Sequence, residues 1–200
     1  MAENKTKYWI LKILLKDLAI KTTITSLAKE TGMSRVGVWK VLKKLEKDKL
    51  VALSPVGTGK TSAYTMSLNW ENPLVEKTLA LALTEDALKY PRWRYNFTEL
   101  EDKVDFLILY GSILHSPKEA NDIDIVGVVS DKKKFSEIHK IIAKVQISQI
   151  KKIHSINFAE EELRNELVSQ KNPAFIDALK KGVVLFGQEK FVKFARKLIK

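Results

Sequence analysis

The chain has 200 residues, of which 45% are hydrophobic and 30% charged, with no cysteine and a formal net charge of +11. This length makes one large domain or two small ones, and the absence of cysteine excludes disulfides and thiolate metal sites. No run of about eighteen apolar residues occurs, so we expect no membrane partner and a cytoplasmic location. Lys12, Lys16 and Asp17 interrupt the apolar N-terminal stretch, which favours an amphipathic helix over a signal peptide.

The positive charge is concentrated in the first third of the chain. Residues 1–70 hold 13 Lys or Arg and 5 Asp or Glu, a net charge of +8, whereas residues 71–200 hold 22 and 19, a net charge of +3. This asymmetry indicates that the first third binds a polyanion. A solvated, lysine-rich surface explains the charge equally well.

The first seventy residues carry the pattern of a small helical domain. A stripe of apolar residues over 8–18 predicts a first helix, 25–31 a second that ends at Gly32, and 35–48 a third that begins after the N-cap Ser34. Two helices joined by a tight turn form a helix-turn-helix unit. Two strand-like segments, LVALSP and AYTMSL, then predict a hairpin, so residues 1–70 read as a winged helix.

The stretch between these strands partly matches the sequence pattern of a nucleotide-binding loop. SPVGTGKTS, residues 54–62, matches the end of the phosphate-loop pattern G-x-x-x-x-G-K-[ST] at Gly59, Lys60 and Thr61. That loop needs a glycine where Ser54 stands and a helix directly after it. Because a strand-like segment follows, we interpret the stretch as a DNA-contacting wing with Lys60 at its tip.

The segment LAKETGMSRVGVWKVLKKLEKDKLV resembles the winged helix-turn-helix domains of microbial transcription regulators, over about a third of the chain. In such domains the third helix lies in the major groove of double-stranded DNA. The resemblance implies base readout by Ser34, Arg35 and Lys40. Phosphate contacts are expected from Lys43, Lys44 and Lys60. A winged helix used for protein contacts is the alternative.

The next segment predicts a helical connector over residues 71–95, followed by a second domain over 96–200. Asn72 and Pro73 form a cap and a proline at the first helical position. The helix is expected to run to about Lys89, because Pro91 stops it.

The second domain begins with VDFLILYGSILHSPKEANDIDIVGVV, residues 104–129. An apolar strand is followed by Gly111 and Ser112, and later by Asp122 and Asp124 at the start of another strand. Two residues apart in a strand, the aspartates lie on one face about 7 Å apart and repel each other. A divalent cation such as Mg²⁺ relieves that repulsion, and the Gly-Ser turn suits phosphate. A surface hairpin with an acidic end is the alternative.

This pattern resembles the nucleotidyltransferases of the DNA polymerase β superfamily, above all the minimal archaeal and bacterial ones, over roughly residues 96–200. The resemblance implies an α+β fold with a mixed sheet flanked by helices. It assigns nucleotide phosphates to Gly111 and Ser112, and Mg²⁺ or Mn²⁺ to the catalytic residues Asp122 and Asp124. A nucleoside triphosphate is then the substrate or ligand. A protein acceptor and a toxin partner are candidates through the resemblance alone.

The sequence departs from the family pattern at one position, and this departure distinguishes an enzyme from a protein that only binds nucleotide. The strand expected to carry a third carboxylate, IKKIHSINF, contains no Asp or Glu. Ser155 or Asn157 is expected at that position, and His154 is a substitute base at best. The acids Glu160 to Glu162 are expected to open the next helix. The sequence therefore leaves three readings: a nucleotidyltransferase, a regulator that senses nucleotide without turnover, which the departure favours, and an inert domain kept for homodimerisation.

Overall fold

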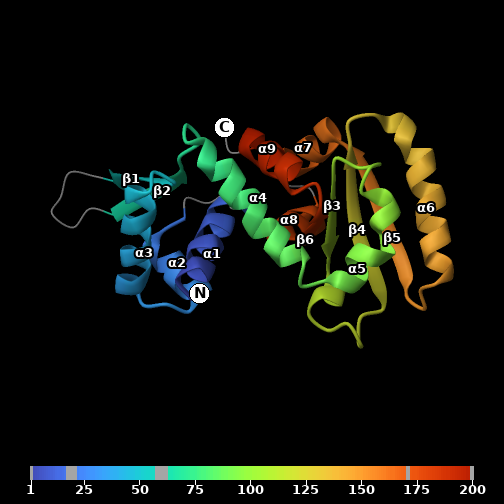
Figure 1. Ribbon diagram of the computed structural model, residues 1–200, viewed down its shortest axis with the longest axis horizontal. Coiled ribbons are helices and arrows are strands. Elements are labelled where there is room, and N and C mark those ends of the chain that lie inside the picture. The colour runs from blue at the N-terminus through green and yellow to red at the C-terminus, as the bar shows by residue number, and fades with distance from the viewer. Residues whose placement is uncertain (1, 17–21, 57–62, 170–171, 199–200) are drawn as a thin grey trace. The chain divides into compact units, whose positions relative to one another are not determined.

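The structure is a computed structural model that describes residues 2–16, 22–56, 63–169 and 172–198 (Figure 1). The chain divides into two compact units, Met1–Ala82 and Leu83–Leu198, which we call unit 1 and unit 2. The division falls within helix α4 (Pro73–Ala87). The predicted α+β class is confirmed. No helix in the described ranges has both the length and the apolar character that a membrane crossing requires.

Unit 1 consists of helices followed by an antiparallel hairpin. Its elements are α1 (Ala2–Lys16), α2 (Ile24–Thr31), α3 (Arg35–Lys47), β1 (Val51–Val56), β2 (Ala63–Leu68) and the first part of α4. The boundaries follow from local capping. The Thr23 side chain accepts a hydrogen bond from the Ser26 N–H, and Gly32 ends α2 with φ of 65°. The Ser34 hydroxyl accepts a hydrogen bond from the Gly37 N–H at 3.1 Å and starts α3. These features agree with the predicted winged helix.

The core of unit 1 uses the apolar stripes expected from the sequence. Helix α1 contributes fully buried Ile10, Leu11 and Leu15, and α3 contributes Val38 and Leu42. The first described element after residues 57–62 is the strand β2, not a helix, so the phosphate-loop alternative lacks the helix that it requires. Lys60 itself lies outside the described residues.

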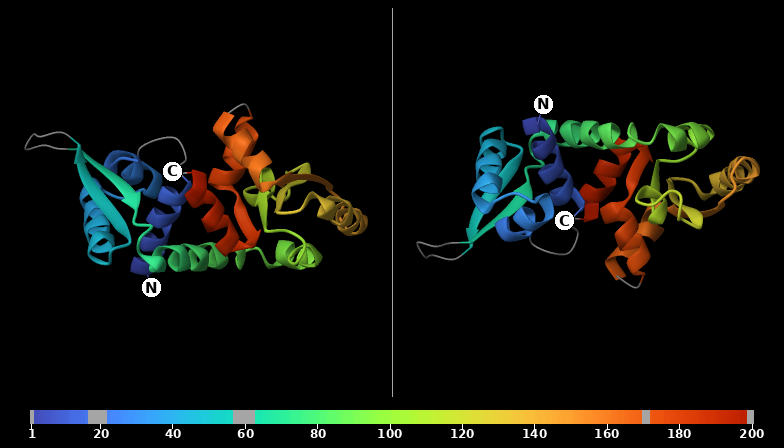
Figure 2. Two further views of the ribbon diagram at one scale, coloured as in Figure 1. Left: turned by 90° about the horizontal axis from the view of Figure 1, so that it is seen from above. Right: turned by 90° about the horizontal axis from the view of Figure 1, so that it is seen from below.

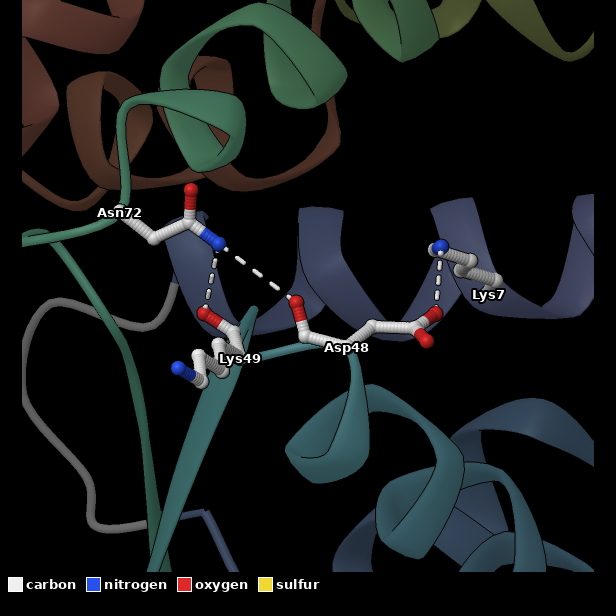
Figure 3. A network of polar contacts seen from close by, with 4 residues as sticks. All are labelled: Lys7, Asp48, Lys49 and Asn72. Atoms are coloured by element: carbon white, nitrogen blue, oxygen red, sulfur yellow. Dashed lines mark hydrogen bonds and ion pairs between the residues drawn. The ribbon is translucent and has the colours of Figure 1, made fainter.

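The end of α3 is tied to the start of α4 by a short polar network (Figure 3). Lys49 follows the helix with φ of 56°, a left-handed conformation that side chains disfavour. The Asn72 amide donates to the Lys49 carbonyl at 3.0 Å, and its oxygen accepts from the Leu74 N–H at 3.0 Å. Asp48 forms an ion pair with Lys7 of α1 at 3.1 Å. Asn72 therefore caps the start of α4 and holds the chain that follows α3.

Unit 2 is a four-stranded mixed sheet with helices packed on it. The strands are β3 (Phe106–Tyr110), β4 (Asp122–Val129), β5 (Lys152–Ala159) and β6 (Val183–Phe186), in the order β5-β4-β3-β6. The helices are α5 (Pro91–Asn96), α6 (Phe135–Ile147), α7 (Glu160–Ser169), α8 (Pro173–Lys181) and α9 (Gln188–Leu198), with short 3₁₀ turns η1 (Thr98–Leu100), η2 (Ser112–Leu114) and η3 (Lys132–Lys134). Only the β4–β5 pair is parallel among these described strands.

The position of β3 and β4 rules out the alternative of a surface hairpin. Both strands lie in the middle of the sheet, and most of their residues are buried. Helices α6 and α7 pack against β5, and α8 and α9 pack against β3 (Figure 2). Most of β4 is buried, and only its first and third residues, Asp122 and Asp124, are partly exposed. Glu160 to Glu162 open α7, as expected.

Candidate functional site

The two aspartates occupy the first and third positions of β4. Asp122 and Asp124 are partly exposed, whereas the intervening Ile123 and the following Ile125 are buried. This alternation is the period of a strand, so both carboxylates project from the same face of the sheet. Tyr110, the last residue of β3, is the register partner of Asp124 and lies beside the pair.

Strand β5 brings His154 to the aspartates. His154 is the register partner of Asp124 in the parallel pair. Its Nδ1 atom lies 3.2 Å from Oδ2 of Asp122 and 3.5 Å from Oδ1 of Asp124. One ligand atom from each of the three residues lies within 4.8 Å of the others. The three side chains therefore form a cluster with the composition and spacing of a metal site.

The prediction that Ser155 or Asn157 occupies the third position is wrong. These residues are register partners of Ile125 and Gly127, whose faces are opposite to that of the aspartates. A Cβ atom on Gly127 would meet the Asn157 side chain at 2.5 Å, which locates Asn157 on that opposite face. Strand parity could have revealed His154: buried Ile153 has to share a face with Ile123, so His154 shares the face of Asp124.

Gly111 lies against the same cluster. Its φ of 82° falls in the left-handed region, and a Cβ atom there would stand 2.6 Å from Oδ2 of Asp124. Both the backbone angle and the carboxylate therefore require glycine. Ser112 opens the 3₁₀ turn η2 and is exposed. The structure thus brings Gly111 and Ser112, predicted to hold phosphate, beside Asp124.

The electrostatics of the cluster favour a cation. Burial raises the pKa of Asp124, the charge of Asp122 raises it further, and His154 offsets only part of this. Burial, followed by the charges of Asp124 and Asp122, also raises the pKa of the Tyr110 hydroxyl. In both cases burial favours the neutral form, and the negative charge of the neighbouring aspartates adds to this effect. A bound positive ion would remove that penalty.

A cavity of about 390 Å³ opens next to Gly111. Its lining includes an acidic and a basic residue of α8, and the full set is Tyr110, Gly111, Leu114, His115, Ala174, Asp177 and Lys181. Lys181 also forms an ion pair with Asp177 at 3.0 Å on the α8 side. The volume falls within the range of small-molecule pockets, and the lining combines apolar with a few polar groups.

Four of the residues predicted to contact DNA lie on α3, whereas Lys60 is outside the described residues. Arg35, Lys40, Lys43 and Lys44 are exposed. Lys43 pairs with Glu46 at 2.6 Å and lies over the Trp39 ring at 5.2 Å. The hydroxyl of Ser34 caps the helix, which commits its oxygen as an acceptor.

The sequence analysis missed Val36, which is 65% exposed in the first turn of α3. Val36 and Trp39 border a second cavity, of about 420 Å³, which reaches Thr25 of α2 and Tyr64 of β2. An exposed valine beside Arg35 is a hydrophobic contact surface on the helix face that carries the basic residues.

Comparisons with known proteins give little further information. No family model matches the sequence, and no curated protein matches it. Two solved structures show weak likeness, both of variants of ZitR from Lactococcus lactis. The first is 17% identical, covers 72% of this chain and 73% of that chain, and has a TM-score of 0.32. The second, in apo form, is 19% identical, covers 74% and 85%, and has a TM-score of 0.31. Scores this low establish no shared fold.

Proposed function

We propose that the protein is a DNA-binding transcription regulator whose unit 2 binds a divalent cation together with a nucleoside triphosphate. The observation that carries the ligand-binding half is the convergence of Asp122, Asp124 and His154 from two adjacent strands, beside the Gly111 turn. The cluster is partly buried where β4 begins, so its carboxylates are partly removed from water. Its like charges cost stability unless a cation joins them.

The proposal for unit 1 rests on shape and charge. Unit 1 contains three helices and a hairpin, and its third helix, α3, carries the exposed Arg35, Lys40 and Lys43. Residues 1–70 carry a net charge of +8. A helix of this kind fits the major groove, while lysines bind phosphates and release counterions. Double-stranded DNA is the polyanion that matches both features.

The proposal for unit 2 rests on the donor atoms and the adjacent space. Two carboxylates and an imidazole are recognised ligands of divalent ions, so the residues present fit a cation, which the sequence predicts to be Mg²⁺ or Mn²⁺. A bound cation would share its remaining positions with phosphate oxygens. Gly111 keeps the turn close to the Asp124 carboxylate, and the exposed Ser112 offers a hydroxyl to a phosphate. The cavity beside Tyr110 is large enough for a nucleoside.

Nucleotidyl transfer is the second candidate function. It is favoured because His154 lies beside Asp122 and Asp124, at the position expected for a third carboxylate. His154 is an ionisable group where active relatives carry a carboxylate. As a base it would take the proton of an acceptor hydroxyl, whose oxygen attacks the α-phosphorus while pyrophosphate leaves. The acceptor, a protein or toxin partner by resemblance, would alternatively bring its own base.

One experiment separates these functions. The full chain is incubated with labelled nucleoside triphosphates, Mg²⁺ or Mn²⁺ and candidate protein acceptors, and bound and transferred label are measured separately. Binding without transfer supports the regulator. Transfer that is lost in Asp122→Asn supports the enzyme. No binding of label in any combination contradicts both functions and leaves unit 2 as an inert, homodimerising domain.

A further inference from the structure

The cluster in unit 2 offers one nitrogen and two carboxylate donors rather than oxygen alone. The nitrogen is Nδ1 of His154, which points at the aspartates at 3.2 Å and 3.5 Å. Two ligands that flank a single ion at the usual metal–ligand distances of about 2.0–2.2 Å lie about 2.9–3.4 Å apart. The His154–Asp122 separation is within that range. The same separation suits an ion pair between the two side chains, so His154 and Asp122 are spaced to contact each other directly or to share one ion.

The main-chain position of His154 is held by α6. The Gln146 side chain accepts a hydrogen bond from the Ile153 N–H at 2.7 Å and donates one to the Lys151 carbonyl at 3.1 Å. Ile153 itself is 7% exposed and anchors β5 in the core. The residue before His154 is thus fixed by both packing and hydrogen bonds. These contacts fix the main chain next to His154, and the imidazole lies against both carboxylates.

Donor chemistry decides which ion such a site prefers. Mg²⁺ takes oxygen ligands and nearly ideal octahedral geometry, whereas imidazole suits first-row transition ions. Affinity for a fixed nitrogen and oxygen set rises from Mn²⁺ through Co²⁺, and Zn²⁺ also exceeds Mn²⁺. A third carboxylate would favour Mg²⁺, but β5 carries His154 in its place.

We propose that His154 makes the cluster of unit 2 a transition-metal site, which binds Co²⁺ and Zn²⁺ more tightly than Mg²⁺, with Mn²⁺ between them. This inference rests on the proposed metal site of unit 2. As a metal ligand, His154 is not free to accept a proton from an acceptor. The inference therefore favours the regulator over a transferase that uses His154 as its base.

The test is a calorimetric titration of the full chain with MgCl₂, MnCl₂, CoCl₂ and ZnCl₂ in turn, with the visible absorption of bound Co²⁺ recorded in parallel. The wild-type protein should bind Co²⁺ at least about tenfold more tightly than Mg²⁺. His154→Ala should lose most of its Co²⁺ affinity and keep its Mg²⁺ affinity within about threefold. His154→Asp, which restores an all-carboxylate set, should narrow or reverse the preference. His139→Ala, at an exposed position of α6, is the matched control and should behave as wild type.

Equal affinity for Co²⁺ and Mg²⁺ in the wild type, or a Co²⁺ preference that survives in His154→Ala, overturns the inference. If Mg²⁺ binding in those cases still depends on Asp122 and Asp124, the proposed metal site stands and only the role of His154 is lost. If the Asp122→Asn, Asp124→Asn double variant binds every ion as wild type does, or if no ion binds the wild type, both the inference and the proposed site fail.

Discussion

Nδ1 of His154 lies 3.2 Å from Oδ2 of Asp122, although Asp122 is the first residue of β4 and His154 the third residue of β5, with α6 between the strands in the sequence. The parallel register of β4 and β5 creates this contact, because it pairs Asp124 with His154 and Asp122 with exposed Lys152. The contact turns a pair of repelling carboxylates into a cluster of three donors. The following predictions test what that cluster and the helices of unit 1 do.

Asp124→Asn should stabilise the metal-free protein at pH 7. The folded state raises the pKa of Asp124 above its ordinary value of 3.8, so the ionised carboxylate destabilises the fold. The stability that the protonated Asp124 side chain gives to the folded state is fully present below pH 3.8. This stability is lost as the pH rises through the pKa of Asp124 in the folded state. We expect the melting temperature in EDTA to rise by roughly 1–4 °C at neutral pH. The gain should vanish below pH 3.8, and a gain that is independent of pH would contradict this cause.

Gly111→Ala should abolish metal and nucleotide binding. The new Cβ atom would stand 2.6 Å from Oδ2 of Asp124 and would displace that carboxylate. The left-handed φ of 82° adds backbone strain of about 1–2 kcal/mol. Gly32→Ala is the matched control, because its φ is also positive, at 65°, but nothing lies within 4 Å of the added carbon. Calorimetry should show lost binding in the first variant and retained binding in the second. Equal ligand affinity in both would mean that Gly111 serves only the turn.

Lys49→Gly should stabilise unit 1 by roughly 0.5–1 kcal/mol, since glycine removes the strain of the left-handed conformation. Asn72→Ala should destabilise it by about 1 kcal/mol, because Asn72 caps the start of α4 and binds the Lys49 carbonyl. Thermal unfolding of the full chain measures both effects. A destabilised Lys49→Gly variant would show that the Lys49 side chain contributes more than its backbone strain costs.

Arg35→Ala and Lys43→Ala should change DNA binding in different ways. Binding of duplexes should weaken steeply with salt. Loss of Arg35 should relax sequence preference at a cost of about 1–3 kcal/mol on the preferred site, whereas loss of Lys43 should weaken all duplexes alike. Lys60→Ala is expected to behave like Lys43→Ala. Lys140→Ala, exposed on α6 of unit 2, is the control. Unchanged affinity for every duplex in the Arg35 and Lys43 variants would contradict the DNA-binding assignment of α3.

Local signals in the sequence predicted most of the fold. The Ser34 cap, Gly32 and the apolar stripes fixed the helices of unit 1, since each acts within a few residues of its own position. The acidic face of β4 followed from the alternation of Asp122, Ile123 and Asp124. What failed was His154, because its place depends on the pairing of strands distant in sequence. The burial of Ile153 gives the face of His154, but the sequence does not specify which residue on that face stands opposite Asp124, because long-range strand pairing sets the register.

The most direct test of the account is a calorimetric titration of the metal-loaded full chain with a nucleoside triphosphate, on wild type and on the Asp122→Asn, Asp124→Asn double variant. The wild type should bind, and its melting temperature should rise by an amount equivalent to about 2.7 kcal/mol at a hundredfold excess of ligand over Kd. The double variant should neither bind nor gain stability. Nucleotide affinity that is unchanged in the double variant would contradict the metal site, and with it the function proposed for unit 2.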